Sequence, residues 1–200
     1  MSIVISFEGL PLTGKSSLAT LVHDYYKIKG YEVVKIVNSH DTDIGIILQK
    51  RISLEKKFDL EAVFLASTEV VNIYQKVLQL VGSKDIIIID SMFSYFLIVS
   101  VMSRIHIKCL EEFILKLSIP HLIFYVVSDF KNVINRKKDK HDLDVILASE
   151  KIFNNVNKEA KSLLLKRSNK KIIQIENNQT EIFETFKSIK PVLDDILKNL

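Results

Sequence analysis

The stretch FEGLPLTGKSS occupies residues 7–17 near the start of the chain. It fills every fixed position of the phosphate-binding pattern G-x-x-x-x-G-K-[ST], with Gly9, Gly14, Lys15 and Ser16. A dense phosphate charge needs several backbone N–H groups that point inward, so the loop must approach it closely and then enter a helix whose positive dipole end faces the anion. Glycine at both ends of the loop permits that path.

The residues on both sides of this loop agree with the motif. The apolar run IVI at residues 3–5 predicts a strand before the loop. Apolar side chains recur at helical spacing behind it, namely Leu18, Leu21, Val22 and Tyr25. Because strand, loop and helix are all present in the required order, nucleotide binding outweighs the alternative of a chance turn rich in Gly and Lys.

Length, composition and charge exclude several classes of protein. The 200 residues fit one domain, and 48% of them are hydrophobic, which is enough for a sizeable core. The net charge of +4 suits anionic ligands but is too small to indicate a nucleic-acid-binding protein. A single cysteine, Cys109, excludes an intramolecular disulfide and favours a cytoplasmic location, with the thiol in the core. We expect neither secretion nor membrane spanning, because no cleavable leader is visible and the apolar runs have the length of strands.

Apolar runs and helical patterns alternate along the rest of the chain. Further strands are predicted at residues 31–37, 86–89, 121–127 and 171–175. Helices are predicted at residues 44–52, 60–81, 92–102, 110–117, 129–138 and 148–166, and after a cap at Thr180. The alternation predicts an α/β fold, a five-stranded parallel sheet with helices on both faces. Ligands of such sheets bind beyond the carboxyl ends of the strands, so the loops after the first four strands should converge on one site.

Three side chains in those loops suit phosphoryl transfer. Lys15 supplies a positive charge for the outer phosphates, and the Ser16 hydroxyl completes the coordination of a magnesium ion. Asp90 ends the isoleucine run of residues 86–89, where a carboxylate holds magnesium directly or through water. An N-cap of the following helix is the alternative role of Asp90, and we favour the metal.

The densest charge cluster of the chain, RKKDKHD at residues 136–142, follows the fourth strand. It is placed to form a short basic lid, at about residues 136–145, that closes over the phosphates. Arg136 is the best single candidate, because a guanidinium binds two phosphate oxygens at once whereas a lysine acts as a point charge. A solvated helix surface is the alternative for the lysines of this cluster.

Six segments resemble, in order and spacing, the thymidylate kinases of the phosphate-loop kinase superfamily. They are ISFEGLPLTGKSSLATLV, GYEVVKIV, FLASTEVVNIYQKV, IIIIDS, LIFYVVSDFKNVINRKK and IIQIENNQTEIFETF. The resemblance implies a three-layer P-loop kinase fold in a single domain over residues 1–200. It also implies transfer of the terminal phosphate of ATP to a nucleoside monophosphate such as dTMP, with ATP and Mg²⁺ as cofactors, and a homodimer formed through a helix like residues 60–81.

The same resemblance assigns roles to individual residues. It makes Lys15, Asp90 and Arg136 catalytic, and Ser16 and Asp90 the metal ligands. The residues that it places on ATP are Gly9, Leu12, Thr13, Gly14, Lys15, Ser16, Ser17 and Arg136. Glu8 matches the FEG of the family, and the turn after the fifth strand lies where relatives pass the adenine.

The acceptor side departs from the family pattern. Pro11 replaces an Asp of the loop that meets the acceptor sugar, and Ser91 replaces an Arg that follows the acidic residue. Glu69, after Thr68, stands where relatives present an Asp-Arg pair to the acceptor phosphate. Asn38, Ser39 and His40 occur where an arginine-containing motif is expected. Cations that could replace the missing arginines are His40, Arg51, Arg104 and Lys108.

Two alternatives to a nucleoside monophosphate kinase therefore stay open. One is a phosphotransferase for a nucleoside or another small hydroxyl compound, which Pro11, Ser91 and Glu69 would suit. The other is a nucleotide-binding protein that has lost catalysis. Zinc and covalent nucleophile mechanisms have no support, because the sequence brings no triad of His, Cys or carboxylates close together.

Overall fold

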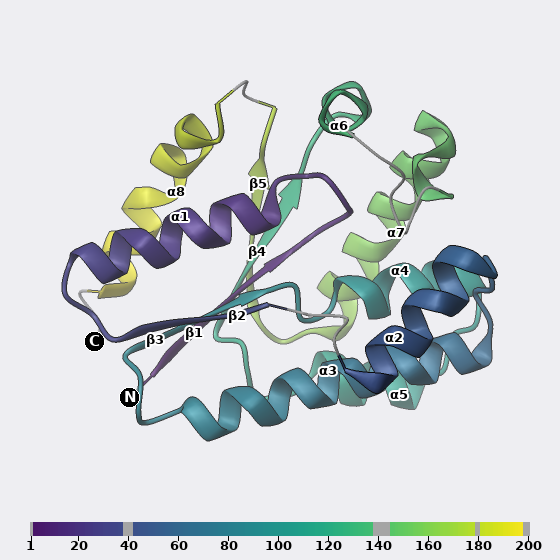
Figure 1. Ribbon diagram of the computed structural model, residues 1–200, viewed down its shortest axis with the longest axis horizontal. Helices are drawn as coiled ribbons and strands as arrows, with labels where there is room; N and C mark the ends of the chain where they lie inside the picture. The colour runs from purple at the N-terminus through teal and green to yellow at the C-terminus, as the bar shows by residue number, and fades with distance from the viewer. Residues whose placement is uncertain (1, 38–41, 138–144, 179–180, 198–200) are drawn as a thin grey trace.

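The computed structural model describes residues 2–37, 42–137, 145–178 and 181–197 (Figure 1). In these ranges five strands form one sheet, in the order β2-β3-β1-β4-β5. They are β1 (Ile3–Glu8), β2 (Val33–Val37), β3 (Ile86–Asp90), β4 (Leu122–Val127) and β5 (Lys171–Glu176). All neighbouring strands run parallel, which confirms the predicted sheet and leaves β3 and β1 in its interior.

The helices connect the strands as predicted, with small shifts at their ends. They are α1 (Lys15–Ile28), α2 (Asp43–Gln49), α3 (Leu60–Leu80), α4 (Ser94–Ser103), α5 (Lys108–Leu115), α6 (Phe130–Arg136), α7 (Glu150–Arg167) and α8 (Ile182–Leu197). A π-helical turn, Lys50–Leu54, continues α2, and a 3-10 turn, Ile146–Ala148, precedes α7. None of the described helices combines the length and the apolar character needed to cross a membrane.

Helices cover both faces of the sheet (Figure 1). Helices α1 and α8 pack together on one face, and α3, α4, α5 and α7 lie on the other. The alternation of side chains along β3 explains the two layers, because Ile86 and Ile88 join the core under α1 and α8, whereas Ile87 and Ile89 join the core under α3 and α4. The three-layer α/β fold predicted from the sequence is therefore confirmed.

Three helices begin at a side-chain cap. Thr42 Oγ1 accepts a hydrogen bond from Gly45 N at 2.9 Å before α2, and Asp59 accepts one from Ala62 N at 3.1 Å before α3. The side chain of Ser149 accepts a hydrogen bond from Ile152 N before α7. Asp129 stands at the N-cap position of α6, as predicted, but its side chain makes no capping hydrogen bond. At Asp129 the polar residue thus predicts where the helix starts but not a capping hydrogen bond.

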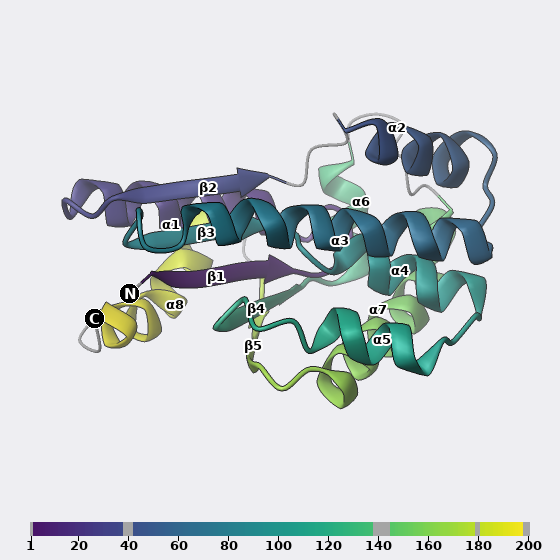
Figure 2. The same ribbon diagram turned by 90° about the horizontal axis from the view of Figure 1, so that it is seen from below.

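Residues 92–102 are too apolar for a surface helix, which predicts a helix packed inside the protein, and α4 is indeed buried on nearly all sides. Seven of its ten residues are buried, among them Phe96, Leu97 and Val99. The helix lies between α3 and α7 (Figure 2) and starts just beyond the end of β3. Its first turn is therefore placed at the edge of the sheet where ligands of parallel sheets bind.

Helix α3 buries only part of the apolar stripe that its sequence predicts, which consists of Leu60, Val63, Phe64, Val70, Tyr74, Val77, Leu78 and Val81. Val63 and Val70 are buried as expected, together with small residues that let α4 approach. Leu60, Phe64 and Leu78, however, are about half exposed. Apolar side chains cover more than one face of this helix, so its sequence pattern could not specify which stripe faces the core.

Three smaller predictions need comment. Cys109 is exposed, not in the core, because it occupies the outward side of the first turn of α5. Pro191, where the sequence predicts a kink or a restart of the last helix, lies inside α8, and the helix continues through it. Thr180 lies outside the described residues.

Candidate active site

The loop of residues 9–14 joins β1 to α1 and passes very close to other backbone and side-chain atoms at its two glycines. Gly9 has a φ of +137°, and a Cβ atom there would lie 2.2 Å from the carbonyl oxygen of Val126. Gly14 has a φ of +99°, and its Cβ atom would lie 2.2 Å from Nδ2 of Asn177. Only glycine fits both positions, since the backbone is left-handed and no space remains for a side chain.

Lys15 is the first residue of α1 and is partly buried in the same loop. Its Nζ donates a hydrogen bond to the carbonyl oxygen of Leu10 at 2.8 Å. Burial lowers the pKa of Lys15 below the usual 10.5, whereas the nearby carboxyls of Asp90 and Glu8 act in the opposite direction. An ammonium group held in a poorly hydrated place attracts phosphate strongly, so Lys15 is suited to the outer phosphates of a nucleotide.

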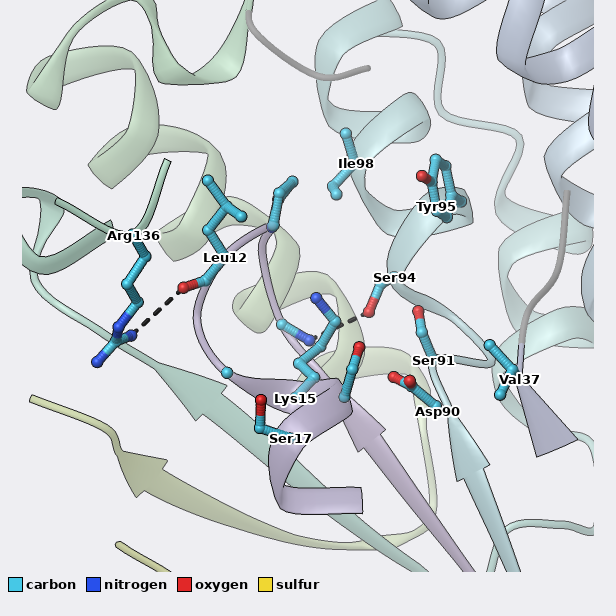
Figure 3. Close-up of a pocket in the computed structure, with 14 residues that line it drawn as sticks. Leu12, Lys15, Ser17, Val37, Asp90, Ser91, Ser94, Tyr95, Ile98 and Arg136 are labelled. Carbon is cyan, nitrogen blue, oxygen red and sulfur yellow. Dashed lines mark hydrogen bonds between the residues drawn. The ribbon is translucent and has the colours of Figure 1, made fainter. Parts of the chain in front are cut away.

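A pocket of about 470 Å³ opens between this loop and the start of α4 (Figure 3). The predicted site residues that line it are Gly9, Leu12, Gly14, Lys15, Ser16, Ser17, Asp90 and Arg136. Thr13 does not line it, because its buried side chain donates to the carbonyl oxygen of Leu10 at 2.9 Å. The volume is in the range of small-molecule sites, and the position beyond the carboxyl ends of β1 and β3 is the expected one.

Asp90 and Ser16 both line this pocket and carry oxygen atoms that suit a metal ion. Asp90 is the last residue of β3 and is almost fully buried, in register with Phe7 of β1. The alternative role of Asp90 as a helix cap is excluded, because the N-cap position of α4 belongs to Phe93. Within the described residues no three His, Cys or carboxylate side chains form a metal cluster. A hydroxyl and a single carboxylate fit Mg²⁺, which keeps several waters and takes its remaining ligands from phosphates.

Glu8 is fully buried and fastens the segment after β3 to the end of β1. Its carboxylate accepts hydrogen bonds from the backbone N–H groups of Met92 at 2.7 Å and Phe93 at 3.0 Å, and from the hydroxyls of Ser6 and Ser94. Burial raises the pKa of Glu8 above the usual 4.5, although these four hydrogen bonds oppose the shift. Glu8 therefore holds in place the first turn of α4, which forms one wall of the pocket.

Arg136, at the end of α6, lines the pocket but directs its guanidinium at the loop (Figure 3). Nη1 donates to the carbonyl oxygens of Leu12 at 3.3 Å and Thr13 at 3.4 Å, and Nη2 donates to that of Asn177 at 2.9 Å. Burial lowers the pKa of Arg136 below the usual 12.5. Its positive charge thus lies beside the phosphate-binding loop, where it also holds the backbone of that loop in place.

Asn177 completes this arrangement from the turn after β5, and its role could not be seen in the sequence. Its Nδ2 donates to the carbonyl oxygen of Thr13 at 2.6 Å, and its Oδ1 accepts from Thr185 Oγ1 at 2.8 Å. The side chain is almost fully buried. An asparagine in a polar turn gives no signal of such a contact, because the two partners are 164 positions away in the loop and eight positions away in α8.

Among the described residues, the wall of the pocket on the side of α4 carries no positive charge. Besides Asp90 it consists of Val37, Ser91, Ser94, Tyr95 and Ile98, and Pro11 of the loop is uncharged as well. Among the described residues that line the pocket, Lys15 and Arg136 are the cations, and both belong to the loop side (Figure 3).

Comparison with known proteins agrees with this geometry. A sequence model of the family described as thymidylate kinase matches residues 7–186. The chain belongs to the thymidylate kinase family. A comparison with curated proteins found no match. Among solved structures, thymidylate kinase from Candida albicans superimposes with a TM-score of 0.66 at 16% identity, over 97% of this chain and 92% of that one. At this identity the likeness shows the fold, which is that of the P-loop kinases.

Membership of the thymidylate kinase family makes the protein a kinase, a phosphotransferase of the type that acts on nucleoside monophosphates. It also confirms the resemblance found in the sequence. The family match does not identify the acceptor. The acceptor depends on the residues that stand where the family has its acceptor contacts.

None of the described cations suggested as replacements reaches the pocket. Arg51 is bound to Asp59 and Glu61, with its Nη2 at 2.7 Å from Glu61 Oε2. Arg104 is exposed beyond the far end of α4, and Lys108 is exposed at the start of α5. The remaining candidate, His40, lies outside the described residues. The loss of the family arginines is therefore not compensated by these three side chains.

Glu69, which reverses the charge expected for the family, is not part of the pocket either. It is buried in α3 and accepts a hydrogen bond from Thr42 Oγ1 at 2.6 Å. Since Thr42 also caps α2, this contact fastens α2 to α3. The suggestion that Glu69 contacts an acceptor sugar is thus not supported by its position, whereas Pro11 and Ser91 do line the pocket.

Proposed function

We propose that the protein transfers the γ-phosphate of ATP to a nucleoside monophosphate, with dTMP as the first candidate. The observation that supports this proposal is the convergence of Lys15, Ser16 and Asp90 on one pocket at the carboxyl ends of β1 and β3. Phosphoryl transfer needs positioned positive charge and little covalent chemistry, and these residues offer that.

Each residue has a distinct part in the proposed reaction. Lys15 and the N–H groups at the start of α1 bind the outer phosphates of ATP. Ser16 and Asp90 would hold Mg²⁺, which neutralises charge on the phosphates when it is bound. Gly9, Leu12, Thr13, Gly14 and Ser17 shape the loop around the phosphates, with Thr13 contributing through its backbone. Arg136 adds positive charge beside the loop and keeps its carbonyl oxygens turned away from the phosphates.

The basic lid at about residues 136–145 remains a prediction. Of its residues, Arg136 ends α6, Lys137 follows it in an extended conformation, and residues 138–144 lie outside the described part of the chain. The single domain over residues 1–200 and a cytoplasmic location likewise remain predictions, the latter supported by the single cysteine.

A coupled assay for ADP release tests the proposal, with ATP, Mg²⁺ and each common nucleoside monophosphate in turn. Turnover with dTMP is expected, and Lys15→Met should reduce it by at least about 10-fold, because one charge-assisted contact with phosphate contributes roughly 1.5–3 kcal/mol. Lys35→Met is the matched control, since Lys35 is on β2 and donates to Thr20 Oγ1 at the surface. ATP binding without turnover of any monophosphate would contradict the proposal and favour a homologue that has lost catalysis.

A nucleoside is the second candidate acceptor, and the wall of the pocket on the side of α4 favours it. A monophosphate dianion needs cations, and none of the described residues on this wall carries a positive charge. The same assay with thymidine and the other deoxynucleosides distinguishes the two acceptors. A higher kcat/KM for nucleosides than for monophosphates would establish the second candidate.

We also propose a homodimer formed through α3. Leu60, Phe64 and Leu78 are about half exposed on this helix, at intervals that return to one side of it. Phe64→Glu should turn the dimer into a monomer in light scattering, whereas Phe113→Glu, on α5, should leave the mass unchanged. A wild-type protein that is monomeric at micromolar concentration would refute the dimer.

A further inference from the structure

Ser91 follows Asp90 and lines the pocket on the side of α4 (Figure 3). Its side chain is 6% exposed, and its Oγ atom has no hydrogen-bond partner among the described residues. A buried hydroxyl without a partner has lost its hydrogen bonds to water and has no hydrogen bond in the protein to replace them, so its burial is unfavourable. Such a group at the wall of a substrate pocket is explained if the substrate supplies the missing partner.

The backbone of Ser91 is held in a fixed conformation by its neighbours. Ser91 has a φ of +71°, a left-handed conformation that residues other than glycine rarely adopt. Its N–H donates to the carbonyl oxygen of Phe7 at 3.1 Å, and Glu8 fixes the next two backbone N–H groups. The Cα–Cβ direction of Ser91 is therefore set by contacts with β1 before any substrate binds.

The neighbouring groups show which kind of ligand suits this position. Ser94 has no hydrogen-bond donor to spare, since its Oγ donates to Glu8 Oε2 at 2.7 Å and also accepts from Gly9 N at 3.1 Å. Lys15 is the cation of this part of the pocket, and the proposed function already assigns it to the phosphates of ATP. A neutral hydroxyl both donates and accepts hydrogen bonds, as Ser91 Oγ does.

We propose that Ser91 is a specificity-determining residue whose hydroxyl binds a sugar hydroxyl of the acceptor. The inference rests on the proposed phosphotransfer, because it places the acceptor between the phosphate-binding loop and α4. It holds for a deoxynucleoside and for a deoxynucleoside monophosphate alike, since both carry the deoxyribose. Recognition of the acceptor at this wall thus depends on a hydrogen bond in place of a charge.

Two variants distinguish the effect of losing the hydroxyl from the effect of relieving the backbone strain at Ser91. Ser91→Ala removes the hydroxyl and keeps the Cβ atom, whereas Ser91→Gly removes the hydroxyl and relieves the φ of +71°. Ser100→Ala is the matched control, because Ser100 Oγ is also buried without a partner but lies in α4 outside the pocket lining. The KM for ATP, the KM for the acceptor and the dissociation constant of the acceptor are measured for each protein.

Both Ser91 variants should raise the KM and the dissociation constant of dTMP or thymidine about 3- to 10-fold, the range for a buried neutral hydrogen bond, and leave the KM for ATP unchanged. Ser100→Ala should change neither. With the 3′-deoxy analogue of the same acceptor, wild type and Ser91→Ala should bind equally, because the partner of the hydroxyl is gone.

Three results would overturn the inference. They are wild-type acceptor affinity in both Ser91 variants, an equal loss in Ser100→Ala, and a Ser91 effect that persists with the 3′-deoxy analogue. Failure of the proposed function has a different signature: the acceptor binds in a Ser91-dependent way, as calorimetry would show, but no ADP is released.

Discussion

At the residue scale, the proposed binding of ATP depends most on the positive charge of Lys15. Burial lowers its pKa below 10.5, so it loses its proton at a lower pH than a lysine in water does. The protonated form binds phosphate, and bound phosphate stabilises that form in turn. Affinity for ATP should therefore fall as the pH rises through the lowered pKa, before 10.5 is reached.

Calorimetric titration with ATP and Mg²⁺ over the alkaline range tests this prediction. Lys15→Arg is the control, because a guanidinium keeps its charge throughout that range. Its affinity for ATP should be lower than that of the wild type but should vary less with pH. Equal pH dependence in the two proteins would assign the effect to another group.

Glu8 is the second residue that titrates in an unusual environment. A glutamine at this position would place an NH₂ group where a carboxylate oxygen accepts the N–H of Met92 or Phe93, so Glu8→Gln should lower the free energy of unfolding by about 1–3 kcal/mol. Because the pKa of Glu8 is raised, the unfolded chain ionises first. The stability that Glu8 contributes is therefore largest below pH 4.5 and declines as the pH rises through its raised pKa.

Urea denaturation of wild type and Glu8→Gln at several pH values measures this difference. The deficit of the variant should shrink as the pH rises from about 4.5, the usual pKa of the group. Glu159→Gln, at an exposed position of α7, should match the wild type throughout. A deficit that is constant with pH would show that Glu8 keeps an ordinary pKa in the folded protein.

At the scale of elements, the phosphate-binding loop is held by the turn between β5 and α8. Asn177→Ala would leave the carbonyl oxygen of Thr13 and the hydroxyl of Thr185 without this partner, which should cost about 2–3 kcal/mol of unfolding free energy. The loop would also lose a constraint on its path, so the KM for ATP should rise several-fold.

Thr185→Val separates the two effects of Asn177, because it removes the contact with α8 and leaves the contact with the loop. It should lower stability, measured by urea denaturation, with little change in the KM for ATP. If Thr185→Val raised the KM as much as Asn177→Ala does, the loop contact would have no separate role.

At the scale of the whole molecule, the sheet separates two cores, and the larger one surrounds α4. Phe96 of α4 is fully buried there, so Phe96→Ala should lower the free energy of unfolding by about 3–5 kcal/mol. Phe113→Ala is the matched control, because Phe113 on α5 is 58% exposed and should change stability by less than about 1 kcal/mol. Comparable losses for the two variants would mean that α4 is not the centre of the core.

Local patterns of sequence determined the phosphate-binding loop, the alternation of strands and helices, and the family. Each of these depends on residues a few positions apart, such as the glycines around Lys15 or the four isoleucines of β3, so short spacing was enough to predict them. The sequence also predicts roles for Asp90 and Arg136, both of which line the pocket, but it gives no sign that Arg136 donates to the loop.

Only the tertiary structure decided how the pocket is built on the side of α4 and how the loop is held. The backbone conformation of Ser91, the hydrogen bonds that join Glu69 to Thr42 and Arg51 to Asp59, and the contact of Asn177 with Thr13 all depend on partners from other elements. Such contacts form where packing brings distant segments together, and no spacing along the chain records which partner a polar side chain will meet.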